Sequence, residues 1–320
     1  MKESEIRPKE LFEKYLELSL KDAQNFNKSD LVEVDCPGCG ERSKEIKFRK
    51  NDFVYRICKK CNSLFCDPRP SEKALELFYS ESESSAYWAN VFFPAVAESR
   101  REKLFRNKAN SLHSLLLKLE RKPKTICDVG AGYGIFLEEL RPFFPDAEFF
   151  AIEPGVESAK MCRQKGFSVL ETTSEKAELW KNRFDLVISS EVIEHVFSPK
   201  DFIRSLFDLA NDNGTVLITG LGYEGFDILT LQERSRSVFP PHHLNFLSVA
   251  GFEFLFKTIG FRFVRIETPG ELDFDIVKNS GFADDFVRVL GDRGEQAISD
   301  FQEFLRKHKL SSHIWVTGLK

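Results

Sequence analysis

The second half of the chain alternates short apolar runs with amphipathic segments. Six apolar runs have the length and composition of strands: "TICDVG", "EFFAIEP", "FSVLE", "FDLVISS", "GTVLITG" and "FRFVRIE". The segments between them, such as "GVESAKMCRQKG" and "SVAGFEFLFKTIG", carry apolar residues at helical spacing. Strands that alternate with helices in this way predict crossover units and a mostly parallel sheet. The closing stretch "SSHIWVTGLK" predicts one more strand, which gives seven in all.

The pattern divides the whole chain into four zones. Residues 1–30 predict a polar amphipathic helix, and residues 31–70 form a short Cys-rich segment broken by Gly and Pro. Residues 71–122 are helical again and could serve as a linker or lid. Residues 123–320 contain the predicted sheet, with a helical insertion at about 271–310 before the last strand.

Composition fits an ordinary globular protein. Hydrophobic residues make up 42% and charged residues 30% of the 320 residues, and the formal net charge is −4. This balance gives no global attraction to nucleic acid or to anionic membranes. No apolar run approaches the ~20 residues that span a bilayer, and the charged N-terminal segment does not resemble a signal peptide. We therefore expect a cytoplasmic protein.

A glycine-rich turn directly follows the first predicted strand of the sheet. In "TICDVGAGYGIF", Gly130, Gly132 and Gly134 alternate with other residues, two positions behind Asp128. Glycines allow a tight turn and let a ligand approach the backbone closely. The spacing is not the G-x-G-x-x-G of nicotinamide-binding enzymes, because position 135 is Ile.

This turn resembles the first motif of class I S-adenosylmethionine (SAM)-dependent methyltransferases. The resemblance implies a Rossmann-like sheet, with the three glycines and Asp128 around the methionine part of the cofactor. It also implies that Glu153, in "FFAIEPG" at the end of the second strand, holds the ribose hydroxyls. We further expect Ser190, which ends the fourth strand, to bind the cofactor.

The fourth strand continues into "EVIEHV", which supplies Glu191, Glu194 and His195. If this segment is helical, the three side chains share one face and converge. The stretch resembles a methyltransferase subgroup that includes ubiquinone-type O-methyltransferases and small-RNA 2′-O-methyltransferases. In parts of that subgroup these residues bind a divalent ion such as Mg²⁺, which would help to deprotonate a hydroxyl. The alternative is that the histidine is structural or acts as a general base.

A second histidine-bearing segment, "FPPHHLN", contains His242 and His243. It follows the fifth strand, so it lies at the ligand-binding edge of a parallel sheet. Histidine is the usual general base near neutral pH. The comparable loop of the small-RNA enzymes supplies a metal ligand. The alternative is a turn whose histidines bond only to the backbone.

The Cys-rich segment has the spacing of a zinc ribbon. Cys36 and Cys39 form one pair, and Cys58 and Cys61 form another, eighteen residues further on. This C-x₂-C-x₁₈-C-x₂-C pattern predicts a structural zinc site with four thiolate ligands. Between the two pairs, "SKEIKFRKNDFVYRI" alternates in the manner of a small hairpin. Paired cysteines of this kind indicate a metal site in a reducing compartment rather than a disulfide framework.

The ribbon and the junction that follows it resemble bacterial methyltransferases with an N-terminal zinc ribbon, which include sugar C-methyltransferases. Tyr223 and Glu224 lie near the catalytic positions of that group, but Gly225 stands where its histidine would be. We therefore expect methyl transfer to a hydroxyl of a small molecule, such as a sugar, a nucleotide sugar or a glycan. The aromatic pair Tyr87 and Trp88 would close over the site or belong to the core.

Three alternatives remain at this point. The first is methylation of a sugar carbon. The second is methylation of RNA held by the locally basic ribbon, although the sparse aromatic residues there and the acidic chain favour a small acceptor over nucleic acid. The third is a SAM-binding protein without enzymatic activity, which would be favoured only if the "EVIEHV" and "PPHHLN" segments faced away from the cofactor.

Overall fold

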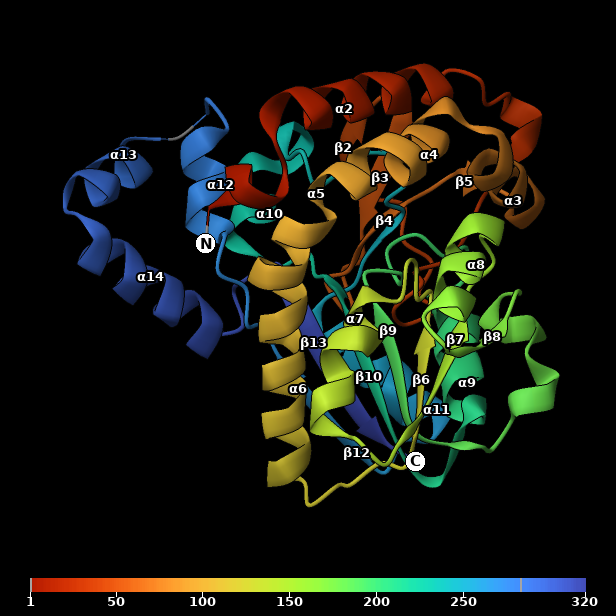
Figure 1. Cartoon of the computed structure of the whole chain (residues 1–320). Helices are drawn as coiled ribbons and strands as arrows, with labels where there is room; N and C mark the ends of the chain where they lie inside the picture. The colour runs from red at the N-terminus through yellow and green to blue at the C-terminus, as the bar shows by residue number, and fades with distance from the viewer. Residues whose placement is uncertain (1, 283) are drawn as a thin grey trace.

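The protein is described by a computed structural model that covers residues 2–282 and 284–320. The two remaining positions fall in the predicted 1–30 and 271–310 segments and lie outside the described residues. A seven-stranded sheet, in the order β12-β13-β10-β9-β6-β7-β8, forms the centre of the molecule (Figure 1). Its strands are β6 (Thr125–Val129), β7 (Glu148–Ile152), β8 (Ser168–Leu170), β9 (Phe184–Ser190), β10 (Ala210–Leu221), β12 (Phe263–Glu267) and β13 (His313–Leu319).

The sheet is mostly parallel, as the sequence predicts. β8, β7, β6, β9 and β10 pair in parallel, and β13 inserts antiparallel between β10 and β12. The middle strands are apolar over nearly their whole length because both of their faces are covered. The closing stretch forms the seventh strand.

Helices cover both faces of this sheet. α6 (Arg106–Lys118), α7 (Ile135–Leu140) and α8 (Val156–Gln164) pack on one face, and α9 (Pro199–Leu209) and α11 (Val249–Ile259) pack on the other. Both layers are closely filled, with aromatic side chains prominent among the buried residues. Phe136 and Phe167 belong to the first layer, and Phe252 and Phe256 belong to the second.

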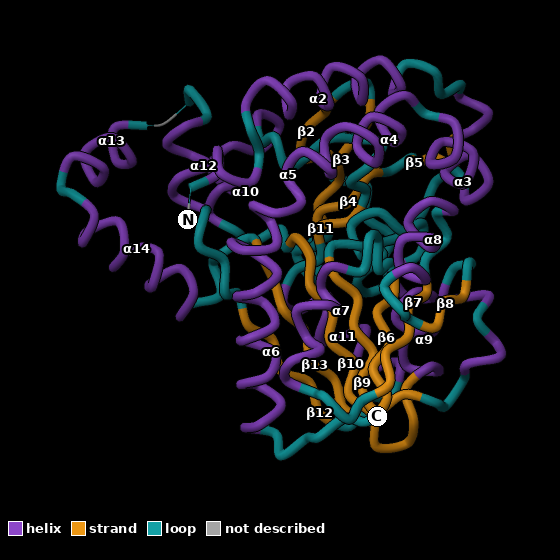
Figure 2. Tube along the Cα trace, in the orientation of Figure 1, coloured by secondary structure: helices purple, strands orange, loops and turns teal. Residues whose placement is uncertain are grey.

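The N-terminal third adds helices above the carboxyl ends of the strands (Figure 2). The predicted first helix is interrupted at Pro8, because the ring of proline fits only the first turn of a helix. The α-helices of this region are α1 (Glu3–Ile6), α2 (Lys9–Ala23), α3 (Glu72–Glu81), α4 (Glu83–Tyr87) and α5 (Phe93–Arg100). A 3₁₀ turn, η1 (Lys28–Asp30), and two π-helical turns, η2 (Trp88–Phe92) and η3 (Arg101–Phe105), join them.

A second sheet, of four strands in the order β11-β4-β3-β2, contains the Cys-rich segment. The predicted hairpin consists of β2 (Ile46–Lys50) and β3 (Phe53–Ile57), followed by β4 (Leu64–Cys66). The fourth strand, β11 (Asn245–Phe246), comes from the distant segment that carries the histidine pair. Two short strands, β1 (Leu31–Val32) and β5 (Arg69–Pro70), pair beside this sheet.

The predicted insertion before the last strand is helical. It comprises α12 (Asp273–Asn279), α13 (Asp285–Asp292) and α14 (Glu295–Lys307), which lie beside α10 (Phe226–Leu231) at one edge of the molecule. The remaining short turns are η4 (Arg141–Phe143), η5 (Ser174–Lys176), η6 (Glu178–Trp180) and η7 (Gln232–Arg234). Among the described residues, no helix combines the length and apolar character needed to cross a bilayer.

Candidate active site

The glycine turn joins β6 to α7 and has the backbone conformation that its sequence predicts. Gly130, Gly132 and Gly134 all have positive φ angles, of 73°, 53° and 70°. A side chain on Gly130 would collide with Val192, whereas a side chain on Gly132 would meet nothing within 4 Å. Gly130 therefore serves close packing, and Gly132 leaves an open approach to the backbone.

Asp128 lies just before this turn, at the end of β6, and is buried. Its Oδ1 atom has no hydrogen-bond partner among the described residues. Burial raises the pKa of Asp128 to about 8, with Glu153 adding to the shift and Lys108 opposing it. A buried carboxyl oxygen without a donor fits the ammonium group of an amino-acid ligand.

Glu153 follows β7 and reaches across to the glycine turn. Its two carboxylate oxygens accept hydrogen bonds from the backbone N–H groups of Gly132 and Gly155, both at 2.8 Å. Burial raises the pKa of Glu153, and these two hydrogen bonds oppose the rise. Each carboxylate oxygen retains a lone pair, so Glu153 can also accept from neighbouring hydroxyls.

The segment after β9 is a tight turn rather than the helix on which the one-face arrangement depended. Glu191 has a positive φ of 58°, and the His195 N–H donates to the carbonyl of Val192. The turn separates the two glutamates. Only Glu194 joins His195, and Glu191 points into a different polar cluster.

That second cluster gathers around Lys108, which extends from α6. Its Nζ atom lies 2.7 Å from Ser190 Oγ, 3.0 Å from Glu191 Oε1 and 3.1 Å from Thr219 Oγ1. His313 Nε2 also lies 2.8 Å from Glu191 Oε1. Although burial opposes ionisation, Lys108 and His313 hold the pKa of Glu191 well below its usual range. Glu191 is therefore ionised and binds Lys108 and His313.

The residues Glu194, His195 and His243 form one convergent group. Each offers a ligand atom, and these atoms all lie within 4.8 Å of one another. Glu194 is buried, and its Oε2 atom has no partner among the described residues. Burial, reinforced by Glu191, raises the pKa of Glu194 well above its usual range. A cation held by these three converging atoms would favour the ionised form of Glu194.

Both histidines of this group are oriented by backbone carbonyls. His195 Nδ1 lies 3.0 Å from the carbonyl of His242, and His243 Nδ1 lies 2.6 Å from the carbonyl of Ser237. A carbonyl only accepts, so each Nδ1 carries the hydrogen and each Nε2 keeps a free lone pair. Burial lowers the pKa of His195 to about 4 and that of His243 well below its usual range, which keeps both rings neutral.

The structure does not bring His242 into this group. Its Nε2 lies 3.0 Å from Ser84 Oγ, and its ring packs among aromatic side chains that include Tyr15 and Phe78. Burial lowers the pKa of His242 well below its usual range. His242 thus supports the loop, and its carbonyl orients His195.

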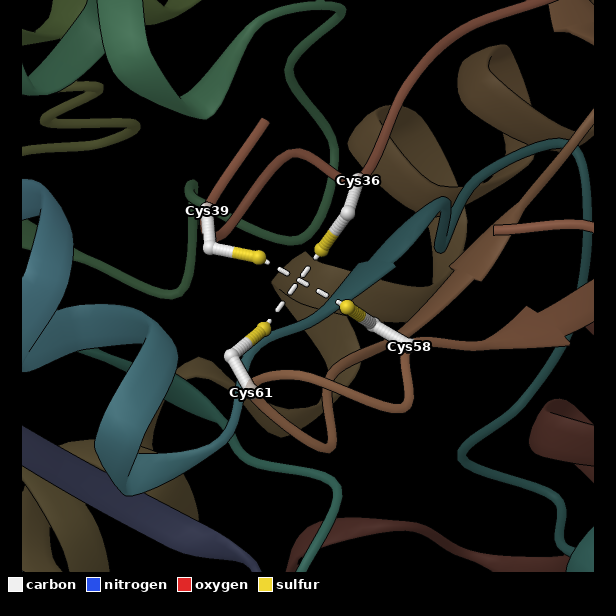
Figure 3. A group of neighbouring side chains, drawn as sticks. All are labelled: Cys36, Cys39, Cys58 and Cys61. Atoms are coloured by element: carbon white, nitrogen blue, oxygen red, sulfur yellow. Dashed lines mark hydrogen bonds between the residues drawn. The ribbon is translucent and has the colours of Figure 1, made fainter. Parts of the chain in front are cut away.

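The four cysteines of the ribbon point toward one centre (Figure 3). Cys36 Sγ lies 3.5 Å from Cys61 Sγ, and Cys39 Sγ lies 3.6 Å from Cys58 Sγ. A tetrahedron with Zn–S bonds of about 2.3 Å has S–S edges of about 3.8 Å. The donor set and these spacings therefore fit zinc.

The ribbon is joined directly to the histidine loop. The hydroxyl of Tyr55, in β3, donates to the carbonyl of His243 at 2.6 Å. The N–H of Cys66 donates to the carbonyl of Leu244, and β4 pairs with β11 immediately beyond. The buried Arg69 side chain donates to Asn245 Oδ1 at 2.8 Å. The ribbon thus fixes the backbone that carries His243.

Several of these residues could not be found from local sequence patterns. Lys108, His313 and Tyr55 have no motif around them, and each reaches the site from an element distant in the chain. The sequence could have pointed to Lys108 and His313 only through their positions on elements that end or begin near the carboxyl ends of the parallel strands. The predicted cofactor residue Ser190 lies in the Lys108 cluster.

In this sheet the last strand, β13, is antiparallel and lies between β10 and β12, and the glycine turn follows the central parallel strand β6. This is the architecture of class I SAM-dependent methyltransferases. The plantazolicin methyltransferase BpumL, solved with a monoazolic desmethylPZN analogue and SAH (S-adenosylhomocysteine), shares this fold with a TM-score of 0.52 at 13% identity. The alignment covers 78% of this chain and 95% of that protein.

A methyltransferase domain family model matches residues 98–266, which is more than half of the chain. The chain therefore belongs to this methyltransferase domain family. It is 30% identical over 118 residues to malonyl-[acyl-carrier protein] O-methyltransferase of Anoxybacillus flavithermus, covering 36% of this chain and 45% of that protein. It is also 30% identical over 105 residues to ubiquinone biosynthesis O-methyltransferase of Photobacterium profundum, covering 31% and 44%. The chain thus spans less than half the length of these curated relatives.

Proposed function

We propose that this methyltransferase transfers the methyl group of SAM to a hydroxyl of a small molecule, such as a sugar, a nucleotide sugar or a glycan. The observation that carries this proposal is the convergent group of Glu194, His195 and His243. It offers one carboxylate oxygen and one nitrogen from each imidazole ring, a donor set that suits a divalent ion such as Mg²⁺ or Mn²⁺.

The cofactor would be held at the glycine turn. The unpartnered Oδ1 of Asp128 would accept from the amino group of the methionine part, and Glu153 would accept from the ribose hydroxyls. The open side of Gly132 lets the ligand approach the backbone. Ser190, which bonds to Lys108, ends β9, and β9 pairs with β6 directly before the glycine turn.

Methyl transfer breaks the bond between sulfur and the methyl carbon and forms a bond between that carbon and the acceptor oxygen. The acceptor must lose its hydroxyl proton, and an alcohol is a poor nucleophile before it does. A divalent ion held by Glu194, His195 and His243 would lower the pKa of that hydroxyl. The chain itself positions the reactants and excludes water.

Oxygen methylation is favoured over carbon methylation by the placement of Glu224. Its carboxylate accepts from the N–H of Val249 at 2.9 Å and from Asn62 Nδ2 at 3.2 Å. It therefore serves the start of α11 and not an acceptor. Both curated relatives described above are named O-methyltransferases, which supports the same choice.

We further propose that the four cysteines bind a structural zinc ion. Part of the ribbon's positive charge is paired within the module, since Lys59 pairs with Glu45 and Arg56 pairs with Asp67. One edge of the ribbon sheet is taken up by β11. Both features favour a scaffold role over RNA binding.

The proposal is tested by Mn²⁺ binding, measured by electron paramagnetic resonance on zinc-loaded protein saturated with SAH. Wild type should bind one Mn²⁺, and the variants Glu194→Gln and His243→Asn should lose that site while keeping their affinity for SAH. His308→Asn, at the exposed end of α14, is the matched control and should bind as wild type does. Equal Mn²⁺ binding by wild type and Glu194→Gln would refute the ion site. Hydroxylated acceptors can then be screened by formation of SAH.

A further inference from the structure

His313 is the first residue of β13, and among the residues that the structure describes it is the histidine bonded to a carboxylate. Its Nε2 atom lies 2.8 Å from Glu191 Oε1. An ionised carboxylate only accepts hydrogen bonds, so Nε2 carries the hydrogen and Nδ1 of the neutral ring keeps its lone pair. We call Glu191 and His313 the dyad.

The Nδ1 atom of His313 is open to a ligand. It has no hydrogen-bond partner among the described residues and, unlike the orphaned oxygen of Glu194, it is not enclosed by the protein. The His313 side chain is 28% exposed, and the Glu191 side chain is 35% exposed. In the ion group of Glu194, His195 and His243, by contrast, both Nδ1 atoms bond to backbone carbonyls. The dyad therefore offers an acceptor nitrogen that the fold itself does not use.

Three donors fix the Glu191 carboxylate in place. Its Oε1 atom accepts from His313, from Lys108 Nζ at 3.0 Å and from the hydroxyl of Thr219 at 2.8 Å. Lys108 is itself held by Ser190 Oγ at 2.7 Å. A carboxylate held in this way orients the ring that it binds, and it stabilises the positive charge that the ring gains with a proton.

One side of the dyad borders the glycine turn. Glu191 directly follows β9, in which Ser189 pairs with Val129 of β6 just before that turn. Val192, the next residue after Glu191, packs on the turn itself, because its Cγ2 atom lies 2.5 Å from the position that a Cβ on Gly130 would take. Glu191 therefore lies beside the proposed SAM site.

The other side of the dyad borders the ion group. A Cβ on Gly220 would lie 2.9 Å from Glu194 Oε2, the carboxylate oxygen without a partner. In β10, Gly220 is flanked by Thr219, which bonds to the dyad, and by Leu221, which pairs with His313. The dyad and the ion group therefore lie next to each other at the end of β10.

We propose that His313, oriented by Glu191, accepts the proton of the hydroxyl that is methylated. This inference rests on the proposed function and adds the proton acceptor to it. The acceptor oxygen bonds to the methyl carbon, the bond from that carbon to sulfur breaks, and its electron pair stays on sulfur. The hydroxyl proton moves to His313 Nδ1, and its bonding pair stays on oxygen. The products are SAH, the methylated acceptor and an imidazolium bonded to the Glu191 carboxylate.

The test uses catechol as a probe, because its two neighbouring hydroxyls chelate a divalent ion and lose a proton when they do. Catechol is titrated by calorimetry, without oxygen, into zinc-loaded protein that holds SAH and Mn²⁺. Titrations in buffers of different ionisation enthalpy give the number of protons released to the buffer. Wild type should release about one proton fewer per bound catechol than His313→Asn, because His313 keeps that proton within the protein.

Glu191→Gln should release an intermediate number, since the neutral amide can still orient the ring but does not stabilise its charge. A merely structural role of His313 would leave the proton balance unchanged. His308→Asn, at the exposed end of α14, is the matched control and should release as many protons as wild type does. SAH affinity reports whether each variant is folded, and His313→Gln serves if His313→Asn is not.

Equal proton release by wild type and the His313 variants would overturn the proposal. Exclusion of catechol from protein that holds Mn²⁺ would also overturn it, because a hydroxyl could then not reach both the ion and the dyad. A protein that binds Mn²⁺ through Glu194 but shows no difference in proton release would lose only this inference. Absence of the Mn²⁺ site would overturn both the inference and the proposed function on which it rests.

Discussion

The hydrogen bond from Tyr55 to the carbonyl of His243 should control the geometry of the proposed ion site. Tyr55 is fully buried within the ribbon sheet, and the bond length is 2.6 Å. No other described residue donates to that carbonyl. Tyr55→Phe removes only the hydroxyl and leaves a buried carbonyl without a donor.

The size of the effect follows from this arrangement. An unsatisfied buried acceptor costs about 1–3 kcal/mol of stability. Residues that orient a metal ligand typically contribute about 10- to 100-fold to metal affinity. Because Tyr55 holds the backbone of His243, Tyr55→Phe should weaken Mn²⁺ binding by about that factor. The glycine turn lies elsewhere, so the affinity for SAH should not change.

Ser43 offers a matched control. Its hydroxyl donates to the carbonyl of Ile57, also at 2.6 Å, but this bond lies within the ribbon and does not reach the histidine loop. Ser43→Ala should reduce stability in urea unfolding without weakening Mn²⁺ binding. If Tyr55→Phe and Ser43→Ala lower stability alike and both keep wild-type Mn²⁺ affinity, the ribbon does not position His243.

Three further predictions concern the cofactor site and a buried acid. Gly132→Ala should fold, at a cost of about 1–2 kcal/mol for its positive φ, but should lose SAM affinity in calorimetry. Gly130→Ala should lose more stability in urea unfolding, because the added Cβ would lie 2.5 Å from Val192 Cγ2. Because the pKa of Asp128 is raised to about 8, SAM binding at pH 7 should release a proton from its carboxyl group, and the affinity for SAM should rise from pH 6 to pH 8. Calorimetry in buffers of different ionisation enthalpy measures this proton release, which should be absent in Asp128→Asn. Burial and Asp273 raise the pKa of Asp227 to about 8 from an ordinary value of 3.8, so the folded state keeps a proton that the unfolded state loses. Stability should therefore fall between about pH 4 and pH 8, and urea unfolding at pH 5 and pH 8 should show a smaller fall in Asp227→Asn; an equal fall would count against this assignment.

The central sheet could be predicted because its signal is local. Strands buried on both faces are continuous apolar runs, and the amphipathic segments between them have helical spacing. The same holds for the glycine turn and for the paired cysteines, in which a few neighbouring residues determine the geometry. The last strand was also predicted, although its antiparallel insertion between β10 and β12 depends on the whole sheet.

The sequence could not predict which of the neighbouring acidic and histidine residues converge in the site. Glu191 and Glu194 are three residues apart and share a face in a helix, but the left-handed backbone at Glu191 sends the two side chains to different clusters. His242 and His243 are adjacent, and only the packing of the loop decides which one faces Glu194. These outcomes depend on contacts from distant elements.

The ribbon's role also depends on a distant contact. The Cys-rich segment predicts its own hairpin, but nothing in it shows that β11 would complete its sheet. That pairing converts a separate module into the support of the histidine loop.

The central claim, that Glu194, His195 and His243 form the ion site of this methyltransferase, is tested most directly by a crystal structure with SAH and Mn²⁺. The account predicts an anomalous difference peak bonded to Nε2 of both histidines and to the Glu194 carboxylate, with SAH against the glycine turn. With SAH in place, a peak elsewhere, or no peak among these three side chains, would contradict it.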